Sequence, residues 1–224
     1  MLDSAGRITA TREPGATPGP LFALVRGATG CVWAARADVP HDIASELDDL
    51  AAREPPIVDL QSAPVYADRY VSLLEGQIWT GQTAEARLRQ TGGPAFAFPA
   101  AVAPPADIVV VENERLLQYN YRGWVAGEIA AGRAPVMAIF EEGHPVSICF
   151  CARNSAVAAE AGLETAAAFR GRGFAPRVTA AWALAIRASG RIPLYSTEWT
   201  NRASLTVARK LGLIAYANSW SLCN

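Results

Sequence analysis

Residues that bind metals or relay protons are scarce in this sequence. Only two histidines, His41 and His144, occur among 224 residues, and each stands alone in a polar, turn-like stretch. The sequence therefore offers too few histidines, too far apart, for a histidine-based metal centre or a catalytic triad. The four cysteines include one Cys-x-Cys but no Cys-x-x-Cys pair, the usual spacing of zinc and redox motifs. The sequence predicts no metal site, and it predicts buried free thiols at the cysteines.

An excess of one charge and a long apolar run are also missing. The formal net charge is −1, and the arginines are scattered along the chain instead of forming a basic stripe. That distribution argues against a nucleic-acid partner. Residues 1–20 lack the apolar core of a secretory signal, and no later stretch approaches the length of a membrane span. We therefore expect a cytoplasmic protein with no nucleic-acid and no membrane partner.

The composition and its periodicity predict a folded protein in three parts. Hydrophobic residues make up 51% of the chain, enough for one sizeable core or two modest ones. Residues 1–20 show no periodicity and predict a flexible arm. Residues 21–105 predict a small α/β region, and residues 106–224 predict the catalytic domain. Within 21–105 the patterns indicate a hairpin (21–25 and 31–35), three helices (41–52, 67–75 and 83–90) and a Pro/Gly-rich connection (92–105).

The last part has the clearest patterns. Its predicted elements are a short strand (108–111), one amphipathic helix or two broken near Gly123 (112–132), a hairpin (135–140 and 146–152), a strand (156–167), a helix (177–189), a strand (192–199), a helix (201–211) and a final strand (213–222). This order predicts a mixed α/β (α+β) fold with a mainly antiparallel sheet that is flanked by helices.

One turn in this part has the character of an anion-binding element. Residues 169–175 read F-R-G-R-G-F-A between a predicted strand and a predicted helix. Gly171 and Gly173 allow a close approach of the backbone to an anion, the helix start adds partial positive charge, and Arg170 and Arg172 add formal charge. Pro176 fits the first helical turn because its missing N–H would have no partner there. By itself, the motif also fits an ordinary tight turn closed by surface arginines.

In its context, the turn resembles the signature of the GNAT superfamily of acyl-CoA-dependent N-acetyltransferases. Arg170, Gly173 and Ala175 fill the fixed positions of the pattern Gln/Arg-x-x-Gly-x-Gly/Ala. Downstream, Asn201, Ser204 and the pair Leu211-Gly212 match the superfamily's Asn-x-x-Ala/Ser and Leu-Gly. The resemblance covers about residues 107 to 224. It implies a sheet whose two central parallel strands splay apart, ending near Thr165 and Glu198.

The resemblance also implies which residues bind acetyl-CoA as co-substrate. Main-chain groups at the end of one strand would bind the pantetheine arm, and backbone groups of the turn would surround the pyrophosphate. Asn201 would hydrogen-bond the cofactor, with Ser204 nearby. The full implied set is Leu163, Glu164, Thr165, Arg170, Gly171, Arg172, Gly173, Phe174, Ala175, Pro176, Asn201 and Ser204.

The catalytic groups are less well defined by this pattern. The superfamily often places a tyrosine beside the leaving thiolate, and the alignment puts Ala208 there. Tyr216, Tyr195, a water or no group at all takes its place. Two glutamates near strand ends, Glu164 and Glu198, are the candidates for the general base, and a pKa raised by burial would suit that role.

Three functions compete for this sequence. The first is an N-acetyltransferase acting on a small-molecule or peptide amine by direct attack. The second is a non-catalytic acyl-CoA-binding regulatory module, which the alanine at 208 favours. The third is a dinucleotide-binding oxidoreductase, with Glu198 as the ribose-binding acid, but Pro176 occupies its third glycine position. The N-terminal hundred residues would shape the acceptor pocket, form a divergent half-repeat, or mediate an oligomer contact such as a homodimer.

Overall fold

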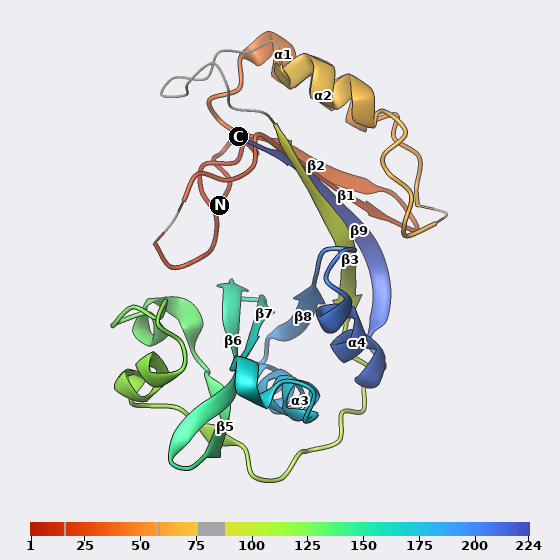
Figure 1. The fold of residues 1–224 in the computed structure, drawn as a ribbon. Coiled ribbons are helices and arrows are strands. Elements are labelled where there is room, and N and C mark those ends of the chain that lie inside the picture. The colour runs from red at the N-terminus through yellow and green to blue at the C-terminus, as the bar shows by residue number, and fades with distance from the viewer. Residues whose placement is uncertain (16, 58, 76–87) are drawn as a thin grey trace.

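A single curved sheet runs through the protein (Figure 1). The computed structural model describes residues 1–15, 17–57, 59–75 and 88–224. Within these residues the sheet has nine strands in the order β2-β1-β9-β3-β8-β7-β6-β5-β4. Its strands are β1 (Phe22–Gly27), β2 (Cys31–Ala35), β3 (Arg89–Ala97), β4 (Val109–Val110), β5 (Met137–Glu141), β6 (His144–Asn154), β7 (Ala158–Thr165), β8 (Ile192–Ser196) and β9 (Ile214–Cys223). Neighbouring strands of this sheet pair antiparallel, except β7 with β8, which are parallel.

Alternating side chains divide the sheet into two faces. On β9, Trp220 and Leu222 pack in one core with the two N-terminal helices, whereas Ser219 and Ser221 point the other way. The helices are α1 (His41–Ala51), α2 (Ala67–Glu75), α3 (Phe174–Ala188) and α4 (Arg202–Lys210), with short helical turns η1 (Glu114–Tyr119), η2 (Ile129–Arg133) and η3 (Ala167–Phe169).

In the part of the sheet around β6, alternate side chains likewise pack on opposite faces. On β6, Cys149 and Cys151 pack in the core that contains α3, and Ile148 and Phe150 pack in a separate core with η1 and its flanking residues. All four cysteines are free thiols; Cys149 and Cys151 are buried, and Cys31 and Cys223 are half-buried. Helix α3 and the η1–η2 segment therefore cover opposite faces of the β6 region (Figure 1).

The predicted fold class is confirmed: the structure is a mixed α+β fold with a mainly antiparallel sheet. The structure contains the predicted hairpins and the predicted helices α1 and α2, and the elements from β5 to β9 follow the predicted order. The segment 112–132 is not one continuous helix: it is broken in two around Gly123, as the second alternative predicted, but the pieces are the short turns η1 and η2 and not α-helices. Gly127 and Gly132 adopt positive φ angles of 92° and 131°, which interrupt the helical backbone.

The predicted connection at 92–105 also differs, because it begins inside a central strand. β3 pairs with β9 and β8 although it contains Gly92, Gly93 and Pro94. A Cβ at Gly93 would lie 1.8 Å from the Thr197 carbonyl oxygen, so only glycine permits this close approach of the two chains. The helix predicted at 83–90 falls mostly outside the described residues, and its last two residues belong to β3. Strands from both sides of residue 105 thus belong to the same sheet. The domain boundary at 105 and the flexibility of the arm stay predictions.

Gly162 on β7 offers a test of packing in this sheet. A Cβ there would lie 2.4 Å from the ring of Phe150, which is buried and held edge-on by Trp124 at 5.3 Å between ring centroids. We expect Gly162→Ala to reduce the free energy of unfolding by about 1–3 kcal/mol through overpacking, as measured by urea denaturation. Gly123→Ala is the control, because its Cβ would meet no atom within 4 Å. Equal stability of both variants would contradict the packing seen here.

Within the described residues, no helix is long and apolar enough to cross a membrane. The same part of the chain holds no group of three or more metal-binding side chains.

Candidate functional site

The parallel strands β7 and β8 separate part of the way along their length. Their pairing ends at Glu160 with Leu194, while β7 continues to Thr165 and β8 to Ser196. On its other side, β7 stays paired with β6 as far as Thr165. The edge of β7 that faces β8 is therefore open beyond Glu160, which gives the splayed strands that the resemblance implied.

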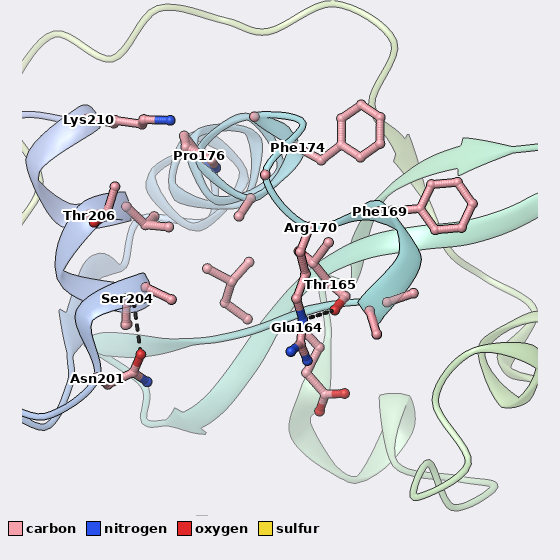
Figure 2. Close-up of a pocket in the computed structure, with 18 of the residues that line it drawn as sticks. Glu164, Thr165, Phe169, Arg170, Phe174, Pro176, Asn201, Ser204, Thr206 and Lys210 are labelled. Carbon is pink, nitrogen blue, oxygen red and sulfur yellow. Dashed lines mark hydrogen bonds between the residues drawn. The ribbon is translucent and has the colours of Figure 1, made fainter.

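A cavity of about 790 Å³ lies at the open end of this splay. Figure 2 shows it between α4 on one side and the turn that follows β7 on the other. Its lining residues come from the two positions after η1, from β7, η3 and the turn, from α3, and from α4 with its N-cap: Asn120, Tyr121, Leu163, Glu164, Thr165, Ala166, Ala167, Phe169, Arg170, Gly171, Gly173, Phe174, Ala175, Pro176, Asn201, Ala203, Ser204, Thr206, Val207 and Lys210. Of the twelve residues implied to bind the cofactor, all except Arg172 line this cavity.

The glycine-rich turn leads directly into α3. Gly171 and Gly173 have φ angles of 80° and 81°, a left-handed conformation that favours glycine, and a Cβ on either would point into open space. Gly173 is the N-cap of α3, so the first N–H groups of the helix begin at this turn. Arg170 Nε donates a hydrogen bond of 3.1 Å to the Thr165 carbonyl, which ties the turn to the end of β7 (Figure 2).

Arg172 lies apart from the other predicted residues. Its guanidinium stacks over the ring of Phe169, at 4.8 Å from the centroid, and it does not line the cavity. Lys210 at the end of α4 does line it and was missed by the sequence reasoning. The amphipathic spacing of α4 from Asn201 onward was the signal that could have indicated Lys210.

The wall opposite the turn is formed by the start of α4. Asn201 is the N-cap of this helix, and its Oδ1 accepts a hydrogen bond of 3.0 Å from Ser204 N–H (Figure 2). The Ser204 hydroxyl in turn forms a hydrogen bond with the hydroxyl of Tyr195 on β8. Ala208 is one turn further along α4 and is buried in the core.

The cap at Asn201 gives a prediction about stability. Asn201→Ala removes the acceptor for Ser204 N–H, and we expect it to lower the free energy of unfolding by about 1 kcal/mol. Asn201→Ser should be nearly neutral, because serine is also a favourable N-cap residue. Urea denaturation of the three proteins measures the difference. If serine and alanine cost the same, the side chain does not cap α4.

Glu164 has an unusual electrostatic environment. Desolvation raises its pKa, the Arg133 guanidinium opposes this shift, and the Glu128 carboxylate adds to it. The side chain is partly exposed at the cavity, yet the surrounding protein displaces enough water to disfavour its charge. Burial also raises the pKa of the neighbouring Tyr121 phenol, and the Glu164 charge reinforces that shift. Glu164 is therefore a more basic carboxylate than usual, beside a neutral phenol.

Glu198, the other predicted base, lies elsewhere. It follows the end of β8 and lines a second cavity, together with Ser196 and Glu160. Glu160 was missed, although a single acidic residue in the otherwise apolar stretch 156–163 could have indicated it. Its Oε1 accepts a hydrogen bond of 2.6 Å from Ser196 Oγ and pairs with Arg153 at 3.0 Å.

The fold is a mainly antiparallel sheet in which one parallel pair of strands splays apart, next to a glycine-rich turn that leads into α3. Residues 134–219 match the family model described as GNAT acetyltransferase. The predicted resemblance to the GNAT superfamily is thereby confirmed over this segment, which contains β5 to β8, α3, α4 and most of β9. No curated protein matches the chain.

Solved structures share the fold. A GNAT-family protein from Novosphingobium aromaticivorans is 19% identical and gives a TM-score of 0.52, covering 61% of this chain and 66% of that one. A GCN5-related N-acetyltransferase-like protein from Streptococcus suis is 17% identical and gives 0.50, covering 91% of this chain and 84% of that one. The match to the Novosphingobium protein thus spans slightly less than two thirds of that protein's length. At these identities the likeness shows the fold alone.

Proposed function

We propose that the protein is an N-acetyltransferase that transfers the acetyl group of acetyl-CoA to an amine by direct attack. The observation that supports this most is the cavity, which joins an open strand edge, a glycine-rich turn and a helix start. A pyrophosphate requires converging N–H donors and positive charge, and a pantetheine arm with two amides requires a strand edge. The residues present fit both parts of the molecule.

The elements of the cavity divide the binding between them. Leu163 and Thr165 would offer main-chain hydrogen bonds to the pantetheine arm. Gly171 and Gly173 would bring backbone N–H groups to the pyrophosphate, and Lys210 would add a positive charge from the opposite wall. Bound acetyl-CoA supplies the activated thioester carbonyl, and the protein supplies position and proton transfer.

Glu164 is the general base in this proposal, because its pKa is raised and it lines the cavity. It would take a proton from the incoming ammonium, directly or through water. The neutral amine then attacks the thioester carbonyl carbon, the carbon–nitrogen bond forms and the carbon–sulfur bond breaks. The nitrogen then loses its second proton and the leaving thiolate gains one; the Ser204 hydroxyl, hydrogen-bonded to Tyr195, would relay this proton in place of the missing tyrosine at position 208.

A ligand screen separates this function from the alternatives. Thermal unfolding is measured with acetyl-CoA, CoA, NAD and NADP, and thiol release is then followed over a panel of amines. We expect stabilisation by the two CoA compounds only, together with thiol release for at least one amine. Stabilisation by a dinucleotide alone would contradict the proposal. CoA binding without thiol release across the panel would favour the regulatory module that the alanine at 208 suggests.

A further inference from the structure

A second cavity, of about 820 Å³, lies under the N-terminal arm, residues 1–20. Figure 1 shows the arm beside β9 and β3, on the side away from α1 and α2. Residues of the arm, among them Arg12, form one side of the cavity. β1, β9 and β3 form its floor, and residues of β6, β7 and β8 close one end.

Small residues form much of the floor of this cavity. Ala23 pairs with Ser221, which pairs with Thr91, so these three side chains form one row across β1, β9 and β3. Ser219 and Gly93 form part of the next row. Because Trp220 and Leu222 point to the opposite face, the residues named in these two rows present hydroxyl groups and no large side chain, and Arg89 on β3 lines the cavity beyond them.

The second cavity and the first are lined by neighbouring segments of the chain near the splay of β7 and β8. On β7, Glu160 lines the second cavity and Leu163 lines the first; three residues of a strand span about 10 Å. After β8, Glu198 lines the second cavity and Asn201 the first. A molecule in the second cavity therefore lies next to the opening through which a thioester in the first cavity would be reached.

The charges that line the second cavity are only partly neutralised. Arg153 pairs with Glu160 on β7 and with Glu13 on the arm, at 3.0 Å each. Among the residues that the structure describes, Arg12 and Arg89 form no ion pair, and neither does Glu198. A complementary ligand therefore carries both a negative and a positive group.

We infer that the second cavity binds the acceptor, and that this acceptor is an amino acid, bearing a carboxylate as well as the amine. The inference rests on the proposed transferase function. Arg12 binds the carboxylate, because the ion pair of its neighbour Glu13 with Arg153 places this part of the arm near Glu160. As the acceptor binds, its ammonium group faces Glu160 and Glu198, and it reaches the general base Glu164, four positions further along β7, when it enters the opening. Arg89 lies six strand positions from Ala95, the residue paired with Ser196, or about 20 Å away, which is too far to share a small acceptor.

The test compares the binding of common amino acids with that of their α-carboxamides, which keep the shape and the amine but lose the negative charge. Calorimetric titrations of the full chain in the presence of CoA measure each pair. We expect at least one amino acid to bind about 10-fold more tightly than its amide. Arg12→Ala should reduce this ratio to near one and leave CoA binding unchanged. Arg69→Ala, an exposed arginine on α2, should keep the ratio.

Three other outcomes of these titrations overturn the inference. Equal binding of acid and amide in the wild-type protein would show that no carboxylate is recognised. An unchanged ratio in Arg12→Ala would show that Arg12 does not bind the carboxylate. The absence of binding by every amino acid at millimolar concentration would show that the cavity is not an amino-acid site. CoA affinity is measured separately in the same samples. A protein that binds amino acids but not CoA would contradict the proposed function and leave the acid-selective cavity intact.

Discussion

Glu164→Gln is expected to reduce kcat by about 10²-fold or more, because the amide cannot accept the proton of the incoming ammonium. The pH dependence follows from the raised pKa of Glu164. A base acts only when deprotonated, so kcat/KM of the wild-type protein should fall as the pH drops through a pKa above the usual glutamate value of about 4.3. The variant should lose this acidic limb. Steady-state thiol release between acidic and neutral pH measures both effects.

The free energy of unfolding of Glu164→Gln gives a second, independent check on the raised pKa of Glu164. A raised carboxyl pKa in the folded state stabilises the protein at low pH, and this contribution is lost as the pH rises through the folded pKa. At neutral pH, Glu164→Gln should therefore unfold no more easily than the wild type. Glu142→Gln, in the exposed turn between β5 and β6, is the matched control for both readings. An unchanged kcat and acidic limb in Glu164→Gln would mean that another group is the base.

Gly173→Val is expected to weaken CoA binding about 10-fold or more, a loss of at least about 1.4 kcal/mol. Its φ of 81° is unfavourable for a β-branched residue, so the turn must rearrange and its N–H groups no longer converge on the pyrophosphate. Calorimetric titration measures the affinity. Acetyl-pantetheine, which lacks the pyrophosphate, should bind equally to the variant and the wild type.

Gly190→Val is the matched control for this turn. Gly190 follows the other end of α3 and has a similar φ of 77°, with open space around its Cβ position. Both variants should lose about 1–2 kcal/mol of unfolding free energy through backbone strain, but only Gly173→Val should lose CoA affinity. Equal CoA affinity in the two variants would show that the turn does not hold the pyrophosphate.

The sequence was most informative where local patterns and tertiary structure agree. The run from β7 through Gly171 and Gly173 into α3 could be predicted, because alternation, left-handed glycines and helical spacing each act locally. The start of α4 near Asn201 could be predicted in the same way, from its helical spacing. Most residues of the first cavity follow from these elements, since a strand end and two helix starts converge on them.

Other parts depend on contacts that no local pattern records. β3 has a composition typical of a loop, and Gly93 is needed there only because the Thr197 backbone approaches it. The turns η1 and η2 are held together by the Glu114 carboxylate, which accepts hydrogen bonds from the N–H groups of Gly127 and Ile129. Glu160 acquires its importance from Ser196 and Arg153, which the fold brings to it. Such residues become identifiable only once the sheet order is known.

The position of β9 between β1 and β3 has a consequence for the order of events during synthesis. The β1–β2 hairpin and the helices α1 and α2 leave the ribosome first, but their core is completed by Trp220 and Leu222 of the last strand. Until β9 emerges, the apolar faces of the first elements lack the strand that completes their core. We expect folding to be slow, because pairings between residues so distant in sequence close long loops. The first elements of the chain can therefore complete their core only after synthesis has reached β9.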